Sequence, residues 1–365
     1  MGDAHRIGVI GLGVISRAYL DTLVGRSAVR VTAVADLDAS RSAAVAAELP
    51  GVQALSVEEL LASPDVDTVL NLTVPAAHAE IALAAVSHGK NVYGEKPLAA
   101  ELTAARGVLE AAEKAAVGVG CAPDTVLGTG VQTARAAVDA GAVGRPLFAS
   151  AVMVTPGHER WHPQPDFYYT AGGGPLLDMG PYYLSSLVHL LGPVRAVIGA
   201  SSRLRTERVI GSGPRAGERI PVEVDSHVSG ILEHEGGALT TITTSFDGVT
   251  TTAAPIEVHG ETGTLTVPDP NTFDGEVRLL ELGADQWRTL APSAGYVGAA
   301  RGVGLLDFVA ADAQRPPRAN GELALHVLET MTALLRSSAE GRRIELSTSV
   351  ERPDPVPLTP PEKWR

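Results

Sequence analysis

A glycine-rich turn near the N-terminus narrows the possible folds further than any other stretch of the chain. Gly11, Gly13 and Ser16 occupy the three positions of a G-x-G-x-x-G pattern, between a strand-like apolar run at residues 7–10 and a helical run that begins near Val14. The two glycines allow a tight turn and let the backbone approach a pyrophosphate, whose charge then lies at the helix N-terminus. Serine at the third position is small, so close packing of helix against strand is expected to survive.

Short β-branched runs alternate with alanine-rich helical patterns from residue 6 to about residue 121. The runs are RIGVIG, VRVTAVAD, VDTVLNLTV, KNVYGEK and VGVGC, with helices between them. Strands separated by helices in this order predict parallel βαβ units and a doubly wound α/β sheet. We therefore expect a Rossmann dinucleotide-binding domain at residues 1–122.

The sequence pattern changes after Cys121. A helical stretch at residues 130–140 is followed by runs with polar and apolar alternation: PLFASAVMV, SHVSGILEH, ALTTITTSF, IEVHG and TLTVP. This alternation predicts a mainly antiparallel sheet with one covered and one available face, within a second domain at residues 123–365. The remaining expectations are a loop at 155–182, a buried helix face at 323–335 and an extended Pro-rich tail at 353–361.

The composition excludes several classes of protein. Of 365 residues, 45% are hydrophobic and 19% charged, which is typical of a globular chain. The 29 Lys and Arg against 42 Asp and Glu give a net charge of −13, which repels nucleic-acid phosphates and anionic membrane surfaces. We find no signal peptide, no apolar run of the roughly 20 residues that a membrane span needs, and no disulfide partner for Cys121. A cytoplasmic protein without nucleic-acid or membrane partners is expected.

An acidic residue ends the second expected strand. A carboxylate at Asp36 can accept hydrogen bonds from the ribose hydroxyls of adenosine and repel a 2′-phosphate, which favours NAD over NADP. Arg41 lies one turn into the next helix and could reach a 2′-phosphate, so NADP stays possible. The competing interpretation is that the glycines only make a tight turn and that Asp36 only caps the helix at 39–48.

Two further segments carry side chains suited to proton transfer. Glu95, Lys96 and Pro97 follow a strand whose carboxyl end lies at the ligand-binding edge of a doubly wound sheet. A partly desolvated lysine beside a cationic nicotinamide can serve in an acid–base relay, although an exposed lysine paired with Glu95 is the alternative. If a helix begins at Asp178, Asp178 and Tyr182 share one face of it and can bind and deprotonate a substrate hydroxyl. The alternative is that Asp178 only caps the helix and Tyr182 is an aromatic residue of the core.

Together these motifs resemble the glucose-fructose oxidoreductase/inositol dehydrogenase (Gfo/Idh/MocA) family. The resemblance rests on GVIGLG with Asp36, LTVP followed by His78, GKNV, EKP at 95–97, AGAVGRP at 140–146, GGGPLLDMG at 172–180, and IEVHG with GTL at 256–265. It spans almost the whole chain. It implies an N-terminal Rossmann domain, a C-terminal α/β domain whose open sheet commonly mediates oligomers, and hydride transfer between nicotinamide and a sugar or polyol carbon. A homodimer or homotetramer formed through that sheet is therefore expected.

The resemblance assigns roles to three residues. Lys96 matches the family's active-site lysine, often followed by a cis bond before proline, and Asp178 matches the acid that orients substrate. Tyr182 stands where the inositol dehydrogenase branch has a histidine. It matches the branch of glucose-fructose oxidoreductase and dimeric dihydrodiol dehydrogenase, in which a tyrosine transfers the proton. The expected mechanism is removal of a hydroxyl proton by Tyr182, assisted by Lys96, as a hydride passes to nicotinamide; the reverse reaction reduces a ketone.

Cofactor contacts are expected around the glycine turn and at two strand ends. Thr73, Pro75 and His78 match the family's loop along the nicotinamide ribose, although His78 could instead be a packing residue at a helix start. The expected cofactor-binding residues are Gly11, Gly13, Val14, Ile15, Asp36, Thr73, Pro75, His78, Glu95 and Lys96.

Substrate contacts are expected from Lys96, Asp178 and Tyr182 and from three further residues: Asp124, Trp161 and His162. Where the family often has Asn-x-Arg after the sixth strand, this chain has CAPDT, so Asp124 binds a substrate hydroxyl or caps the next helix. The loop at 157–169 is rich in aromatic residues, which suits a sugar pocket wall or a subunit contact. No metal is expected, because prolines at 163 and 165 argue against a helix carrying His158 and His162.

Two other functions are compatible with the same fold. Some members use NAD transiently, giving glycoside cleavage, elimination or epimerisation without net redox change, and some Rossmann proteins only sense nucleotides. The presence of both Lys96 and Tyr182 argues against pure sensing.

Overall fold

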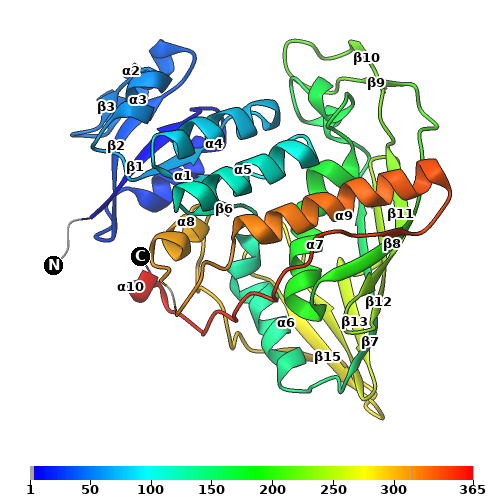
Figure 1. Cartoon of the computed structure of the whole chain (residues 1–365). Coiled ribbons are helices and arrows are strands. Elements are labelled where there is room, and N and C mark those ends of the chain that lie inside the picture. The colour runs from blue at the N-terminus through cyan, green and yellow to red at the C-terminus, as the bar shows by residue number, and fades with distance from the viewer. Residues whose placement is uncertain (1–3, 313, 365) are drawn as a thin grey trace. The chain divides into compact units, whose positions relative to one another are not determined.

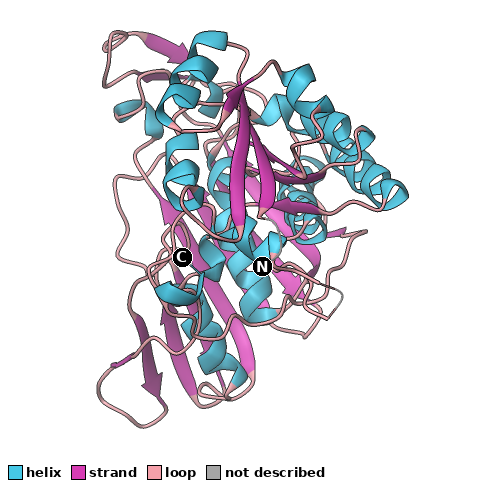
Figure 2. Ribbon diagram, turned by 90° about the vertical axis from the view of Figure 1, so that its left-hand side faces the viewer, coloured by secondary structure: helices cyan, strands magenta, loops and turns pink. Residues whose placement is uncertain are grey.

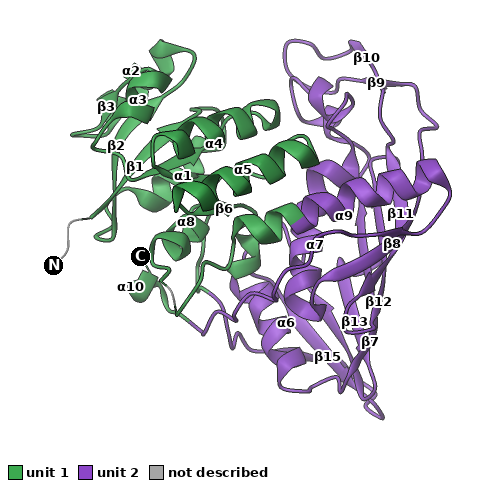
Figure 3. Cartoon of the chain, viewed as in Figure 1, with its two compact units in different colours: residues 1–127, 296–325, 359–365 green, residues 128–295, 326–358 purple. Residues whose placement is uncertain are grey.

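The computed structural model describes residues 4–312 and 314–364 (Figure 1). They form two compact units (Figure 3). The first contains the described residues up to Leu127, then Tyr296–Leu325 and those from Thr359; the second contains Gly128–Gly295 and His326–Leu358. The chain first leaves the Rossmann unit close to the predicted boundary after residue 122. The return of two later segments was not predicted, so residues 123–365 are not one compact unit.

The first unit is built on a six-stranded parallel sheet. Its strand order is β3-β2-β1-β4-β5-β6. The strands are β1 His5–Ile10, β2 Val29–Ala35, β3 Gln53–Ala54, β4 Thr68–Asn71, β5 Asn91–Gly94 and β6 Val119–Cys121. The central strands are mostly buried, apart from polar residues near the amino ends of β1 and β2, because helices cover both faces of such a sheet. The order reverses between β1 and β4, and ligands bind at the carboxyl edge beside such a reversal.

Helices connect these strands in the predicted alternating order. They are α1 Ser16–Leu23, α2 Ala39–Glu48, α3 Val57–Ala62, α4 His78–Ser87 and α5 Leu102–Ala115; the later segments add α8 Val303–Val309, the start of α9 Gly321–Glu340, and α10 Pro361–Trp364. The helix after the glycine turn begins at Ser16, two residues later than predicted, because residues 13–15 form the turn itself. The Pro-rich tail carries two isolated β-bridges and ends in α10.

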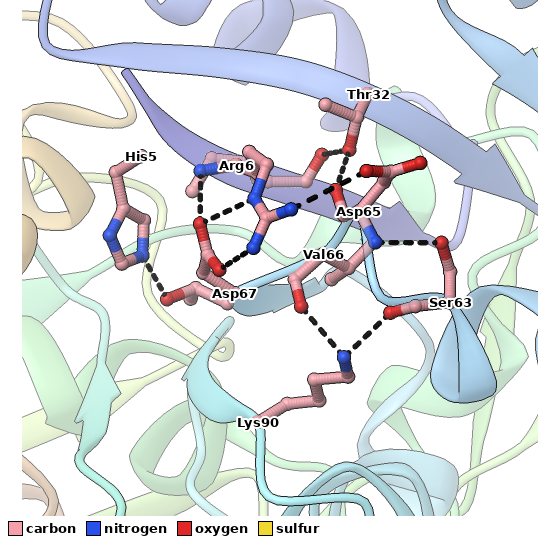
Figure 4. Close-up of polar contacts among 10 residues, drawn as sticks. His5, Arg6, Thr32, Ser63, Asp65, Val66, Asp67 and Lys90 are labelled. Atoms are coloured by element: carbon pink, nitrogen blue, oxygen red, sulfur yellow. Dashed lines mark hydrogen bonds and ion pairs between the residues drawn. The ribbon is translucent and has the colours of Figure 1, made fainter. Parts of the chain in front are cut away.

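Polar side chains close the amino edge of this sheet (Figure 4). Arg6 binds both carboxylate oxygens of Asp67, through Nε at 3.0 Å and Nη2 at 2.5 Å. Lys90 donates to the carbonyl oxygens of Ser63 and Val66 at 2.6 and 2.8 Å. Both cations are therefore engaged at the edge of the sheet opposite the glycine turn.

The second unit contains a nine-stranded sheet, seen with its strands side by side in Figure 2. Its order is β16-β15-β14-β13-β7-β12-β11-β8-β17, and every pair is antiparallel except β7 with β12. The strands are β7 Pro146–Val154, β8 Val194–Ser202, β11 His227–His234, β12 Leu239–Ser245, β13 Ile256–Gly260, β14 Gly263–Val267, β15 Val277–Glu281, β16 Arg288–Leu290 and β17 Ile344–Glu345. The predicted mainly antiparallel sheet is confirmed.

Helices cover one face of that sheet. They are α6 Thr129–Asp139, α7 Pro175–Leu191 and the part of α9 in this unit. Leu334 of α9 packs so closely on β8 and β11 that only glycine fits opposite it: a Cβ at Gly199 would lie 2.2 Å from its carbonyl oxygen. The predicted buried face of α9 is confirmed, with Met331 and Leu334 fully buried.

The predicted loop at 155–182 is shorter than expected. It contains the 3₁₀ turns His158–Arg160 and Asp166–Tyr168, and α7 begins at Pro175, whose fixed φ suits the first turn of a helix. A two-stranded sheet, β9 Glu207–Val209 with β10 Arg219–Pro221, packs beside this loop. No helix in the described part of the chain has the length and apolarity to cross a membrane.

Candidate active site

The glycine turn follows β1 at the carboxyl edge of the Rossmann sheet. Gly11 has φ +94°, and a Cβ there would lie 2.7 Å from the carbonyl of Leu72, so only glycine fits. Nothing lies within 4 Å of a Cβ built on Gly13. The Ser16 hydroxyl, buried at the third position, donates to the Gly13 carbonyl over 2.7 Å. Serine therefore closes the turn where the pattern has glycine.

Asp36 lies at the end of β2, beside this turn. Its carboxylate accepts hydrogen bonds from the backbone N–H of Leu12 at 2.7 Å and of Asp38 at 2.9 Å. Asp36 does not cap α2, because Asp38 does so through Ser40. Two N–H groups thus hold the Asp36 carboxylate next to the glycine turn, where a ribose is expected.

Open space borders the turn on the side of α1 and α2. A hollow of about 690 Å³ is lined by Leu12, Gly13, Val14, Ser16, Arg17, Leu20, Asp21, Val24, Arg41, Val45, Glu48 and Leu49. Val14 is 99% exposed. Arg41 lines the hollow and lies 3.6 Å from the Asp38 carboxylate. The turn is therefore accessible to a ligand.

His78 joins the loops that follow β4 and β5. Its ring is buried, with Nδ1 2.6 Å from the Pro97 carbonyl and Nε2 3.0 Å from the Thr73 carbonyl. It is also the first residue of α4. These contacts are those of a packing residue at the start of a helix, which was the alternative for His78. A direct cofactor contact of Thr73, Pro75 or His78 stays a prediction.

Lys96 follows β5 at the same edge. The adjacent Glu95 is 9% exposed; its carboxylate accepts a hydrogen bond from the Tyr19 hydroxyl at 2.8 Å and one from the Lys96 N–H at 3.1 Å. The Lys96–Pro97 bond is cis, as the resemblance implied. Glu95 is therefore engaged by Tyr19 of α1 and by the backbone of Lys96, and it links the helix after the glycine turn to the lysine.

Asp124 has a different role from either one predicted. It is fully buried, and its Oδ2 accepts hydrogen bonds from Gly302 N–H at 2.7 Å and Gly304 N–H at 3.2 Å, at the start of α8. Burial raises the pKa of Asp124 to about 6. The predicted substrate contact is not supported, because no surface of this side chain is accessible. Its side chain does not cap the 3₁₀ turn Thr125–Leu127 that follows it either, because Oδ2 is bonded to Gly302 and Gly304 and Oδ1 forms no hydrogen bond with any residue that the structure describes.

In the second unit, Asp178 and Tyr182 lie four residues apart on α7, as predicted. The residue before the helix is Gly174, with φ +95°, so Asp178 lies in the first turn and is not the N-cap. Its side chain is 18% exposed, and its Oδ2 lies 3.1 Å from His158 Nε2. Tyr182 is 6% exposed. The helix thus presents a carboxylate and a phenol on one face.

The loop before α7 contains a cluster of aromatic rings that includes His158. Trp161 is 59% exposed and Phe167 is 53% exposed. The rings of His162, Phe167 and Tyr168 lie within 5.6 Å of one another, and burial lowers the pKa of His162. The predicted substrate contacts of Trp161 and His162 stay predictions. The sequence analysis considered His158 only as a metal ligand and did not predict its contact with Asp178. The four-residue spacing between His158 and His162 gives no indication of that contact.

Two family models together cover most of the chain. Residues 5–122 match the oxidoreductase family with an NAD-binding Rossmann fold, and residues 131–266 match the GFO/IDH/MocA C-terminal domain. The 1,5-anhydro-D-fructose reductase of Ensifer adhaerens is 30% identical over 358 residues, which are 95% of this chain and 100% of the relative. The chain belongs to the GFO/IDH/MocA family.

A second relative and two solved structures are also similar to this chain. Inositol 2-dehydrogenase 3 of Saccharopolyspora erythraea is 30% identical over 299 residues, covering 81% of this chain and 78% of the relative. The solved structure of an NAD-binding oxidoreductase from Klebsiella pneumoniae has a TM-score of 0.81 at 24% identity, over 95% of this chain and 100% of that one. A levoglucosan dehydrogenase solved with NADH and L-sorbose has a TM-score of 0.79 at 21% identity, over 95% and 100%. These two structural matches show the fold.

Membership in the GFO/IDH/MocA family makes the chain an NAD-binding oxidoreductase. The predicted family, fold class and cofactor are thereby confirmed. The residues at the glycine turn fit the cofactor: Gly11 allows the turn to pack against Leu72, the space beside Gly13 is open, and Asp36 holds a carboxylate next to the turn, where a ribose is expected.

Proposed function

We propose that this protein is a dehydrogenase or reductase that acts on a secondary alcohol, or the matching ketone, of a cyclic sugar or polyol. The single observation that carries the proposal is the pairing of Asp178 with Tyr182 on one face of α7, behind a loop of aromatic rings. A carboxylate and a phenol one helical turn apart suit the recognition and deprotonation of a hydroxyl. Aromatic faces such as that of Trp161 suit the C–H face of a sugar ring.

The named relatives support this substrate class. The two relatives at 30% identity are called a 1,5-anhydro-D-fructose reductase and an inositol 2-dehydrogenase. Both names describe chemistry at a carbon that carries a hydroxyl or a carbonyl oxygen in a six-membered ring. Hydride transfer at such a carbon is therefore the reaction we assign to this chain.

In this proposal each residue has a separate task. NAD supplies the hydride acceptor, or NADH the donor, when it is bound. Asp178 accepts a hydrogen bond from a substrate hydroxyl and so orients the reacting carbon. Tyr182 exchanges the proton of the reacting hydroxyl, with assistance from Lys96. A phenol has an ordinary pKa of about 10, so a nearby positive charge is needed for this step near neutral pH.

The test compares three variants with the wild-type protein. Nicotinamide absorbance is followed with NADH or NADPH and 1,5-anhydro-D-fructose, and with NAD or NADP and a panel of cyclic polyols, aldoses and glycosides. We expect Lys96→Ala and Tyr182→Phe each to lower kcat by about 10²–10⁴-fold, the usual size of an acid–base contribution. Cofactor affinity, measured by fluorescence titration, should stay largely intact. Tyr183→Phe is the matched control, since it removes a buried hydroxyl from the adjacent helix position.

Two outcomes contradict the proposal. Loss of folding in Lys96→Ala, seen by circular dichroism, would make the lysine a structural residue. A flat absorbance trace for the wild-type protein with tightly bound NAD would point to transient redox chemistry, and product analysis on glycosides would then identify cleavage or epimerisation.

A further inference from the structure

The imidazole of His158 lies between two polar partners. Trp161 Nε1 donates a hydrogen bond to His158 Nδ1 over 3.3 Å, and His158 Nε2 lies 3.1 Å from Asp178 Oδ2. An indole N–H is a donor only, so Nδ1 is the acceptor and carries no proton. The ring proton of His158 is therefore on Nε2, where it is donated to the carboxylate.

Aromatic rings restrict how His158 can turn. The ring centroids of Phe246, Tyr168 and Trp161 lie 4.5, 4.7 and 5.3 Å from that of the imidazole, at interplanar angles of 54°, 70° and 60°. They come from three places: the end of β12, the second 3₁₀ turn and the residue after the first. These three rings pack around the imidazole and limit the space in which it can rotate.

The backbone on both sides of His158 is also held in place. Arg208 of β9 donates to the Pro156 carbonyl at 3.1 Å and to Glu159 Oε1 at 3.3 Å. Gly157 has φ +104°, and a Cβ there would lie 2.2 Å from Glu159 Oε2. His158 therefore projects from a segment that is anchored at Pro156, two residues before it, and at Glu159, the residue after it.

We propose that His158 is a positioning residue that fixes the rotation of the Asp178 carboxylate for substrate binding. The inference rests on the proposed function, in which Asp178 orients a substrate hydroxyl. A carboxylate in the first turn of a helix is stabilised as an anion, but it can rotate about its Cβ–Cγ bond. A hydrogen bond to Oδ2 from an anchored imidazole holds that oxygen toward His158 and so restricts this rotation.

The consequence is a loss of substrate orientation when the bond is removed. His158→Leu deletes both ring nitrogens, and we expect kcat/KM to fall about 10–100-fold, mainly through KM, since small misplacements of a bound substrate are costly. His158→Gln keeps an N–H at a reach similar to that of Nε2. It should therefore recover most of the lost kcat/KM, which a mere packing role of the ring would not predict.

The experiment uses the full-length protein with four variants: His158→Leu, His158→Gln, Asp178→Asn and, as a control, His88→Leu. His88 is an exposed residue at the end of α4. Kinetics are measured with NADH and 1,5-anhydro-D-fructose and with NAD and myo-inositol. Long-range ¹H–¹⁵N spectra of protein labelled at its ten histidines report the tautomer of each ring, and the His158→Gln spectrum assigns the His158 signals.

The proposal predicts a neutral Nε2–H tautomer for His158 whose Nε2 signal shifts in Asp178→Asn. A Nδ1–H tautomer, or no response to Asp178→Asn, would overturn it whether or not either substrate is turned over. A wild-type KM in His158→Leu together with impaired Asp178→Asn would also overturn it and leave the proposed function standing. Full activity in Asp178→Asn would instead refute the role of Asp178 in the proposed function.

Discussion

Asp36 combines two tasks at one position. Its carboxylate is oriented by the N–H groups of Leu12 and Asp38, so its charge is fixed beside the glycine turn. The same charge favours the free ribose hydroxyls of NAD and repels the 2′-phosphate of NADP. The predicted preference for NAD over NADP therefore depends on a side chain that is positioned by the turn itself.

Asp36→Ala should weaken NAD selectivity. We expect the ratio of kcat/KM for NAD to that for NADP to fall about 10–100-fold, because a hydrogen bond to a charged group contributes about 1.5–3 kcal/mol. Steady-state kinetics with both cofactors measure this ratio. Asp38→Ala is the control. It removes a carboxylate from the same connection between β2 and α2, and it lowers the stability of α2 because the helix loses its N-cap. An unchanged ratio in Asp36→Ala would be inconsistent with the assignment.

Asp124 is an acid whose ionised form is disfavoured by burial. Its pKa is about 6 in the folded chain, against an ordinary value of 3.8. Between those values the folded state binds the proton and the unfolded state does not, so this group's contribution to stability falls as pH rises from about 4 to about 6. The ionised carboxylate then costs on the order of 3 kcal/mol above that range.

Asp124→Asn should remove this pH dependence. The amide oxygen can still accept hydrogen bonds from Gly302 and Gly304, while the side chain no longer titrates. We expect the variant to gain stability relative to the wild-type protein as pH increases from 4 to 7, with the gain levelling off above 6. Urea denaturation at a series of pH values gives the difference. A difference that is constant with pH would show that Asp124 keeps its ordinary pKa.

At the level of elements, the β9–β10 pair holds the aromatic loop through one arginine. The Arg208 side chain is 2% exposed and bonds to Glu159 and Asp247, and its guanidinium lies over the Tyr169 ring at 5.3 Å. Tyr169 in turn donates a hydrogen bond to Glu159. A buried cation thus joins the loop before α7 to the hairpin and to the end of β12.

Arg208→Met should be strongly destabilising. It leaves Glu159, whose side chain is 6% exposed, without its cation, and breaking a buried ion pair typically costs about 3–5 kcal/mol. Arg219→Met on the paired strand is the control, because its ion pair with Glu207 is exposed and such pairs contribute about 0–1 kcal/mol. Chemical denaturation of both variants provides the comparison. Equal, small losses would mean that the network does not anchor the loop.

At the level of the whole molecule, the second face of the nine-stranded sheet carries apolar side chains that are partly exposed. Ile198 and Ile231 are neighbours across β8 and β11, at 43% and 37% exposure. Leu239 pairs with Phe148, whose ring stacks on His259 at 4.4 Å. Contiguous apolar surface of this kind on a sheet is typical of a contact with another protein surface.

We predict that the protein is a homodimer or homotetramer that assembles through this face. The double variant Phe148→Lys with Ile231→Lys should dissociate into smaller species, because lysines at these positions would be buried without partners. Sedimentation velocity measures the state of each protein. Leu282→Lys, at a residue that is 82% exposed and follows β15, is the control and should assemble normally. A wild-type monomer at all concentrations would contradict the prediction.

The sequence alone determined the elements and the cofactor. Strand and helix periodicity, the turn at Gly11 and the acid at Asp36 depend on residues close together in the chain, so short-range stereochemistry was sufficient to predict the βαβ order and NAD binding. The spacing of Asp178 and Tyr182 likewise follows from the helical repeat. The contacts between segments that are distant in the chain could not be predicted from such local patterns.

Tertiary structure decided the contacts between distant segments. Asp124 binds Gly302, 178 residues away, and residues 296–325 rejoin the Rossmann unit, because a buried carboxylate takes whichever N–H groups the chain path brings to it. His158 reaches Asp178 across a loop whose conformation depends on Arg208 of another strand. Local patterns specify which residues can bond, whereas the path of the chain specifies which of them meet.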